Sequence, residues 1–187
     1  SIQDTIVMLR KAVFDDDGKD KDVTEGIMPF MCYDKQGLDM DISFSPKLTK
    51  KECKWAFDLI KENMEDRYDA SGYGWDDDDK MRELKEDGAR FLLARWDEDA
   101  ECLDQGELTA MAHFRFSVQG EFMDEMKGDS CLIVWDLHVE HEYQRKGLGK
   151  HLLTIMELIA KREGMSRIYI PIQLNDEIGL EWIESVC

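Results

Sequence analysis

Residues 144–149 read Gln-Arg-Lys-Gly-Leu-Gly, between an apolar run at 130–139 and an amphipathic segment at 148–161. The run before these residues is rich in β-branched and aromatic side chains, which predicts a buried strand. The segment after them repeats apolar residues at helical spacing, which predicts a helix. The six residues therefore form a strand-to-helix turn. The buried face of the helix is expected to hold Leu152, Leu153, Met156 and Ile159.

This turn has the properties of an anion site. Gly147 and Gly149 let the backbone bend tightly and approach a bound group closely. The helix that begins here offers unpaired amides and the positive end of its dipole. Arg145, Lys146 and Lys150 add positive charge in an otherwise acidic chain. We therefore expect a ligand with phosphate groups at this turn.

The spacing of the glycines excludes two common phosphate-binding motifs. A dinucleotide site requires G-x-G-x-x-G and a nucleotide-hydrolysing loop requires G-x-x-x-x-G-K-[ST], and this turn matches neither. The pattern Q-x-x-G-x-G between a strand and a helix resembles motif A of the GNAT acetyltransferases, which cradles the pyrophosphate of coenzyme A. This resemblance implies the GNAT fold, of the α/β (α+β) class, with a mixed central sheet, flanking helices and splayed parallel strands that hold acetyl-CoA.

The same resemblance implies which residues bind the cosubstrate, acetyl-CoA. The backbone of Leu137, His138 and Val139 is expected to hydrogen-bond its pantetheine arm. Asn175 stands where family members often contact the cofactor, with a helix cap as its alternative role. The expected pyrophosphate loop comprises Gln144, Arg145, Lys146, Gly147, Leu148, Gly149 and Lys150.

Further helices and strands can be placed on both sides of the turn. Thr49 and Glu52 form a capping-box pattern at the start of a long helix, and strict alternation makes 38–45 the first predicted strand. An acidic turn at 97–106 indicates that the strands at 90–96 and 107–118 form an antiparallel pair. From 130 onward the order strand, helix, strand, helix indicates that the strands at 130–139 and 167–172 lie parallel and side by side. The predicted helices lie at 1–14, 49–68, around 81–84, at 148–161 and around 180–186, and the predicted strands lie at 38–45, 90–96, 107–118, 130–139 and 167–172.

A second resemblance is more specific than the turn. Several segments recur in the same order in the NatD family, the N-terminal acetyltransferases that modify histones. This resemblance covers most of residues 50–175 and implies acetyl transfer to the α-amine of proteins that begin Ser-Gly-Arg, as two nucleosomal histones do. The segments are Trp55-Ala56-Phe57-Asp58-Leu59, Asn63-Met64, Tyr68, Gly74-Trp75, His113-Phe114-Arg115-Phe116 and 145–150.

The NatD resemblance implies site residues position by position. Tyr68 matches a tyrosine at the substrate amine, and Asp136 stands where the family has a glutamate linked to catalysis, so these two are the expected catalytic residues. Tyr73 replaces a tryptophan beside Tyr68, and Trp75 follows glycines that could line a peptide groove or else packs in a core. Substrate contacts are expected from Tyr73, Trp75, Ser117 and Trp135.

Several positions depart from the family pattern. Trp135 and Ile133 replace tyrosines, and Ser117 replaces an aspartate that meets the substrate arginine. Asp136 keeps the charge of glutamate but reaches less far, a gap that a water molecule could bridge. The attacking α-amine has an ordinary pKa of about 7.7–8.0, so a carboxylate, phenol or water can remove its last proton. A backbone amide of strand 137–139 is the expected donor to the thioester oxygen.

Composition narrows the possible partners. The 187 residues carry a net charge of −18, which disfavours nucleic acid and suits basic histone tails, although acidic surfaces also simply maintain solubility. We expect no membrane helix, because no apolar run is long enough, and no secretory signal at residues 1–14. Five scattered cysteines indicate free thiols, and the histidines show no metal-ligand spacing. We expect a monomer of the cytoplasm and nucleus, without a metal.

Two alternatives stay open. One is a GNAT enzyme that acetylates a lysine side chain or a small polyamine, which an acidic surface would suit equally well. The other is an inactive module that binds acetyl-CoA or histones, which the substituted site positions favour. We expect residues 1–187 to form a single GNAT domain, from which the closing C-terminal strands are missing.

Overall fold

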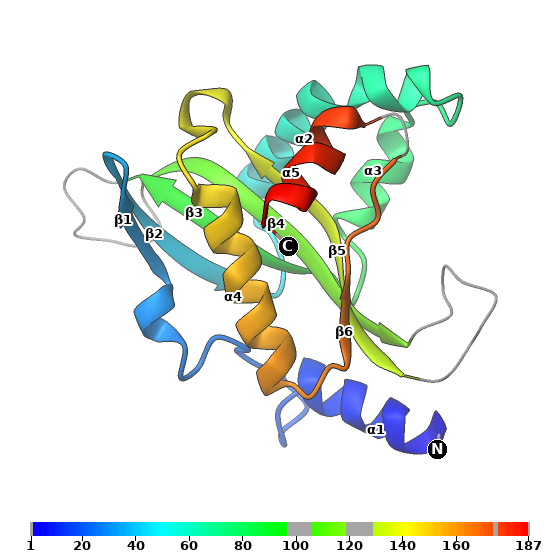
Figure 1. Ribbon diagram of the computed structural model, residues 1–187. Helices are drawn as coiled ribbons and strands as arrows, with labels where there is room; N and C mark the ends of the chain where they lie inside the picture. The colour runs from blue at the N-terminus through cyan, green and yellow to red at the C-terminus, as the bar shows by residue number, and fades with distance from the viewer. Residues whose placement is uncertain (1, 97–105, 119–128, 174–175, 187) are drawn as a thin grey trace.

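The protein is built around one six-stranded sheet in the order β1-β2-β3-β4-β5-β6 (Figure 1). Neighbouring strands are antiparallel except β5 and β6, which run parallel. The computed structural model describes residues 2–96, 106–118, 129–173 and 176–186. This mixed sheet with flanking helices confirms the predicted α/β class. The strands are β1 (Cys32–Lys35), β2 (Leu38–Ser45), β3 (Arg90–Trp96), β4 (Glu107–Val118), β5 (Ser130–Val139) and β6 (Arg167–Tyr169).

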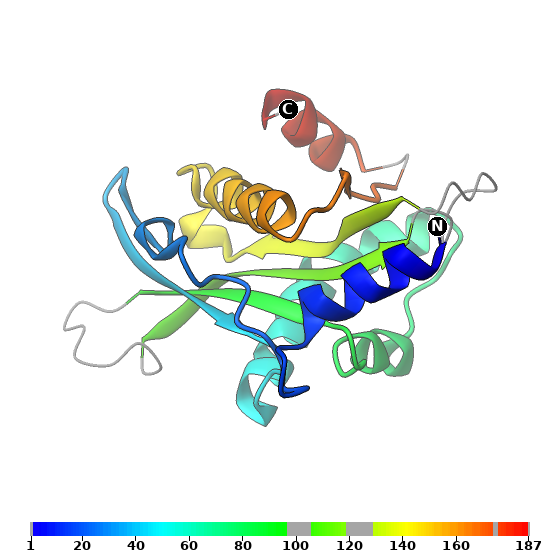
Figure 2. The same ribbon diagram turned by 90° about the horizontal axis from the view of Figure 1, so that it is seen from below.

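Helices cover both faces of the sheet, as Figure 2 shows from below. The helices α1 and α4 pack with one large apolar cluster, whereas α2 and α3 pack with a second cluster on the opposite face. In this view α5 lies beyond α4, at the edge where β5 and β6 run. No helix among the described residues is long and apolar enough to cross a membrane. The helices are α1 (Ile2–Val13), α2 (Lys50–Ala70), α3 (Asp77–Glu83), α4 (Leu148–Arg162) and α5 (Glu177–Val186), with short 3-10 turns η1 (Met28–Phe30) and η2 (His141–Tyr143).

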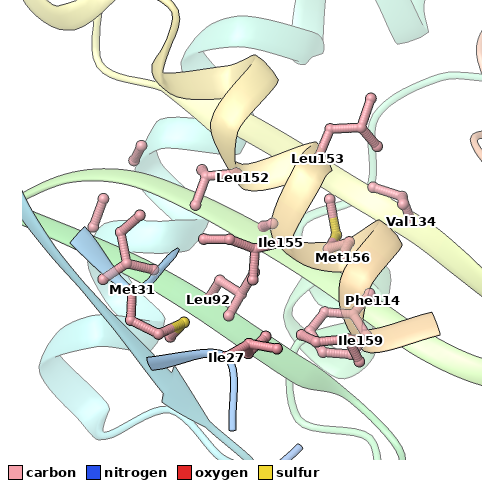
Figure 3. Packing of buried hydrophobic residues seen from close by; sticks show 14 of the residues in the cluster. Ile27, Met31, Leu92, Phe114, Val134, Leu152, Leu153, Ile155, Met156 and Ile159 are labelled. Atoms are coloured by element: carbon pink, nitrogen blue, oxygen red, sulfur yellow. The ribbon is translucent and has the colours of Figure 1, made fainter. Parts of the chain in front are cut away.

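The larger core holds α4 against the sheet (Figure 3). The face predicted to be buried is buried: Leu152, Leu153, Met156 and Ile159 are each at most 3% exposed. These side chains pack against sheet residues such as Phe114 and Val134. Because the burial of each such side chain stabilises the fold by about 1.5–3 kcal/mol, this packing fixes the position at which α4 begins.

Two of the predicted strand assignments need correction. The strand predicted at 167–172 ends at Tyr169, and β1 precedes the strand that was predicted to be the first. β1 is short and joined to β2 by Gln36 and Gly37, which both have positive φ (58° and 74°), as a tight hairpin turn requires. The predicted capping box is confirmed, because the Thr49 side chain accepts from the Glu52 amide and the Glu52 carboxylate accepts from the Thr49 amide.

The sheet opens between β5 and β6. Only Cys131–Ile133 of β5 pairs with β6, so the rest of β5 has no strand partner on that side among the described residues. At the same point Trp135 is an extra residue in the β4–β5 ladder, where the register shifts between His113 and Phe114. Such a bulge bends and twists its strand. The exposed edge of β5 therefore becomes available to a ligand.

Candidate active site

A pocket of about 430 Å³ lies along this open edge. It extends from the start of α4 across β5 to α2 and α5. Its walls combine the backbone of the opened strand with the loop before α4. The lining residues from β5 and this loop are Leu137, His138, Val139, Tyr143, Gln144, Arg145, Gly147, Leu148, Gly149 and Lys150.

The start of α4 presents free amides to the pocket. Gly147 is the N-cap, with φ +84° and no side-chain cap. The first bond of the helix joins the amide of His151 to the carbonyl of Gly147, so the amides of Leu148, Gly149 and Lys150 make no such bond. Together with the dipole, these amides favour an anion.

Tyr33 fixes the shape of the loop before α4. Its hydroxyl donates a 2.5 Å hydrogen bond to the carbonyl of Lys146. A Cβ at position 147 would overlap the Tyr33 hydroxyl, so glycine is required there for space as well as for its positive φ. The Gln144 side chain anchors the other end of the loop by donating to the carbonyl of Val139 at 2.9 Å.

A smaller pocket of about 140 Å³ lies next to the larger one. The two pockets share Met64, Leu137, His138, Asp176, Gly179 and Trp182. The walls of the smaller pocket are largely apolar, but they also include Tyr68 from α2 and Asp136 from β5. The structure therefore brings together the two residues that were predicted to be catalytic.

Asp136 lies in a buried network of charges. Its Oδ2 is 3.0 Å from His113 Nδ1, and its Oδ1 is 3.4 Å from the ammonium nitrogen of Lys80 and 3.8 Å from His138 Nε2. Lys80 also pairs with Glu83 at 2.6 Å. Desolvation alone would raise the pKa of Asp136. The hydrogen bond from His113, the nearby His138 ring and the charge of Lys80 outweigh it and hold the pKa of Asp136 well below its ordinary value.

His113 connects this network to β4 and α3. Arg115 Nε donates to His113 Nε2 at 3.3 Å, which assigns the imidazole proton to Nδ1, where it can be donated to Asp136. The ring is fully buried and stacks on Phe91 with 4.9 Å between centroids. His113 therefore packs in the core and also holds the carboxylate of Asp136 through its Nδ1.

The pKa values of two other ionisable groups near the pocket differ from their ordinary values. Burial alone would lower the pKa of Lys80, but Asp136 and Glu83 raise it above its ordinary value, so Lys80 stays charged. Burial raises the pKa of Tyr68. Tyr68 therefore keeps its proton at neutral pH and can act as a donor.

Comparison with known proteins identifies the family. A family model described as the acetyltransferase (GNAT) family matches residues 56–184, which is most of the chain. The chain belongs to the GNAT acetyltransferase family. GNAT enzymes transfer an acetyl group from acetyl-CoA, and this assignment agrees with an anion site at the start of α4.

Solved structures show the same fold. The chain is similar to a ribosomal-protein-alanine N-acetyltransferase from Brucella melitensis biovar Abortus 2308, with a TM-score of 0.55, 19% identity, and coverage of 79% of this chain and 90% of that one. It is also similar to the aminoglycoside 6′-N-acetyltransferase AAC(6′)-Ih from Acinetobacter baumannii, with a TM-score of 0.54, 16% identity, and coverage of 79% of this chain and 88% of that one. A third similar structure is AAC(6′)-Iy, which was solved with a CoA bisubstrate analogue. Its TM-score is 0.51 and its identity 14%, with coverage of 79% of this chain and 88% of that one. At these identities the likeness concerns the GNAT fold alone.

The residues present fit acetyl-CoA. The free amides at the start of α4, with Arg145 and Lys150 beside them, suit the pyrophosphate. The unpaired edge of β5 offers backbone groups to an amide-containing arm such as pantetheine. Of the predicted cofactor residues, all lie on the larger pocket except Lys146, whose carbonyl instead accepts from Tyr33, and Asn175, which lies outside the described residues.

The predicted substrate residues divide into two groups. Trp135 lines the smaller pocket. The other three, Tyr73, Trp75 and Ser117, line neither pocket. Tyr73 is 88% exposed, and Trp75 packs edge-on against Tyr68. Ser117 lies near the end of β4, where it pairs with Cys131. No pattern in the sequence pointed to Tyr33, Lys80 or the Arg67–Asp176 ion pair. Each acts through a residue that is distant in the chain, so local patterns could not reveal it.

Proposed function

We propose that this GNAT enzyme transfers the acetyl group of acetyl-CoA to the N-terminal α-amine of a protein, in particular of histones that begin Ser-Gly-Arg. One observation carries the proposal. The cleft that suits acetyl-CoA continues, at Leu137 and His138, into a small apolar pocket that contains an ionised carboxylate, Asp136. Such a pocket suits a small cationic group at the end of a chain better than a bulky neutral one.

The charges around the pocket support an amine acceptor. The network contains two cations, Lys80 and Arg115, and three carboxylates, Asp136, Glu83 and Glu86. Within these described ion pairs the carboxylates outnumber the cations by one, and Lys80 and Asp136 are buried, where charges interact strongly. In addition, Gln173 lines the smaller pocket and its buried Oε1 has no hydrogen-bond partner among the described residues. An N–H group of the acceptor would satisfy this oxygen.

The site residues can serve acetyl transfer to an amine. The amine nitrogen attacks the thioester carbon, the carbon–sulfur bond breaks, and the amine loses a proton. Negative charge on the thioester oxygen needs a donor, for which a backbone amide of Leu137–Val139 is suited. Tyr68 carries its proton at neutral pH, as a phenol with an ordinary pKa of about 10 does and as burial favours further, so its phenol can donate to the departing sulfur. Asp136 stabilises positive charge on the amine.

The choice of a histone tail rests on two features. The NatD-like segments contribute residues to the candidate site, because Asn63 and Met64 line the larger pocket and Met64 and Tyr68 line the smaller one. The net charge of −18 favours a basic partner over nucleic acid. We propose that the enzyme acts on histone tails as a monomer, in the cytoplasm and the nucleus.

Acetyl transfer to synthetic peptides tests this proposal. One peptide begins Ser-Gly-Arg-Gly with a free α-amine, and a matched peptide has a blocked α-amine and a free lysine. We expect transfer to the first peptide and its loss in Gly147→Trp, whose side chain would fill the space at the loop. Transfer only to the blocked peptide or to a polyamine would contradict the proposal and would show that the acceptor is a lysine side chain or a polyamine. Binding of acetyl-CoA without any transfer would instead indicate a binding module.

A further inference from the structure

His138 occupies the junction of the two pockets. It lines both of them, and its side chain is 12% exposed, in the half-buried last part of β5 that follows Asp136. Since the pockets meet where an acceptor amine would reach the thioester, His138 is the imidazole closest to the proposed reaction. His113, by contrast, is fully buried and lines neither pocket.

Asp136 is poorly placed to take a proton itself. Its Oδ2 is occupied by the hydrogen bond from His113, and its Oδ1 faces the ammonium of Lys80 and the ring of His138. A carboxylate surrounded by donors is stabilised in its charged form and is a weak base. A neutral imidazole accepts a proton more readily, which is why histidine is the commonest general base.

We propose that His138 is the catalytic residue that accepts the proton of the attacking amine, and that Asp136 is a positioning residue that orients its ring. This inference rests on the proposed transfer of acetyl to an amine. His138 Nε2 faces Asp136 Oδ1 at 3.8 Å, and in the proposed mechanism Nε2 carries the proton toward the carboxylate while Nδ1 holds the lone pair. The distance is longer than a hydrogen bond, as is common for catalytic pairs before substrate binds.

The proposed step balances in atoms and electrons. The lone pair of the neutral amine forms the carbon–nitrogen bond with the acetyl carbon. The carbon–sulfur bond breaks, and its electron pair remains on sulfur. One proton leaves the nitrogen for His138 Nδ1, and the thiolate gains one proton from Tyr68 or solvent. The products are an amide and the free thiol of coenzyme A; His138 then releases its proton to solvent, and Tyr68, where it was the donor, takes one proton back from solvent.

Several charged or titratable groups face this position from the surrounding elements. Tyr68 and Arg67 come from α2, Lys80 from α3 and His113 from β4. The opposite charges of Arg67 and Asp176 pair at 2.6 Å, which limits their effect on the imidazole. The groups that line the shared wall or the nearby loop are Tyr68, Arg67, Asp136, Asp176, Tyr143, Arg145 and Lys150.

Steady-state kinetics over a range of pH test the role of His138. The acceptor is whichever amine the unmodified enzyme acetylates. We expect His138→Gln to lower kcat by about 10²-fold or more, with little change in the Kd for acetyl-CoA. The acidic limb of the kcat profile should lose one ionisation, and imidazole added to His138→Gly should restore part of the rate. Asp136→Asn should lower kcat while retaining this limb, because the imidazole is still present.

His141→Gln is the matched control, because His141 is exposed on η2 and lines neither pocket. It should leave kcat and the pH profile unchanged. A His138→Gln enzyme with normal kcat and an unchanged acidic limb would overturn the inference. So would a slow His138→Gln enzyme that keeps the limb and is not rescued by imidazole, because its defect would then be structural. The proposed function fails separately, if the unmodified enzyme acetylates no α-amine.

Discussion

The hydroxyl of Tyr33 donates to the carbonyl of Lys146, although 113 residues separate the two in the chain. This bond joins the first hairpin to the loop that begins α4. Tyr33 is only 5% exposed, so its ring is held by the core and its hydroxyl has little freedom. The shape of the anion site is therefore set by an edge strand that local sequence did not reveal.

Tyr33 and Gly147 should behave as a coupled pair. Gly147→Ala places a Cβ against the Tyr33 hydroxyl at φ +84°, and the unfavourable backbone alone costs about 1–2 kcal/mol. Tyr33→Phe loses one hydrogen bond, worth about 1 kcal/mol. In the double variant the nearest atom to the new Cβ is Tyr33 Cζ at 3.5 Å, which is an ordinary contact. We expect its loss of acetyl-CoA affinity and unfolding free energy to be smaller than the sum of the single losses, whereas additive losses would contradict the coupling.

Asp136 should make stability depend on pH in acid. Burial by itself raises its pKa, but His113, His138 and Lys80 lower it well below the ordinary value. The resulting stabilisation is complete above the unfolded pKa of about 3.9 and disappears as pH falls toward the folded pKa. We expect Asp136→Asn to lower the unfolding free energy by about 3 kcal/mol near neutral pH, and the deficit to shrink below about pH 4.

Urea unfolding from about pH 7 to about pH 3 measures this change, with unfolding free energies extrapolated to water at each pH. Asp34→Asn is the control, since Asp34 is exposed on β1. It should show a small effect at every pH. A deficit in Asp136→Asn that stays constant through acid would contradict the predicted linkage.

The Arg67–Asp176 pair should hold α5 over the cleft. Arg67 Nη1 lies 2.6 Å from Asp176 Oδ1, which also accepts the amide of Gly179 and so caps α5. Asp176→Ala removes both contacts, and loss of the cap alone costs about 1 kcal/mol. We expect faster hydrogen exchange in α5 and weaker acetyl-CoA binding, because α5 lines the larger pocket. Glu184→Ala, exposed on the same helix, should leave both properties unchanged; protection that persists in Asp176→Ala would refute this role.

Arg145 and Lys150 should give acetyl-CoA binding a dependence on salt. Both are exposed and line the larger pocket beside the free amides of α4. Their attraction for phosphate is screened by ions. We expect alanine at either position to weaken binding several-fold at low salt and less at high salt, measured by titration calorimetry. Lys161→Ala, at the opposite end of α4, is the matched control, and equal losses at both salt concentrations would argue against an electrostatic role.

Much of the secondary structure could be predicted because its patterns are local. The strand predicted at 38–45 has the bounds of β2, Leu38–Ser45, since its alternation is a property of consecutive residues. The helix that begins after Thr49 was predicted from a capping box that spans four residues. β6 was predicted too long because apolar residues continue to Ile172, whereas the chain leaves the ladder after Tyr169. Apolar composition alone does not show whether a partner strand is within reach.

By itself, the sequence determined the GNAT turn, the strand and helix on either side of it, and the candidate positions Tyr68 and Asp136. Glycine conformation, helix dipoles and apolar periodicity are short-range effects, so a few neighbouring residues are enough to encode them. Only the tertiary structure decided the environment of those positions. It surrounded Asp136 with Lys80 and two histidines, left His138 at the junction of two pockets, and placed Tyr73 and Ser117 outside them. Electrostatics and burial depend on distances between residues far apart in the chain, and these exist only after folding.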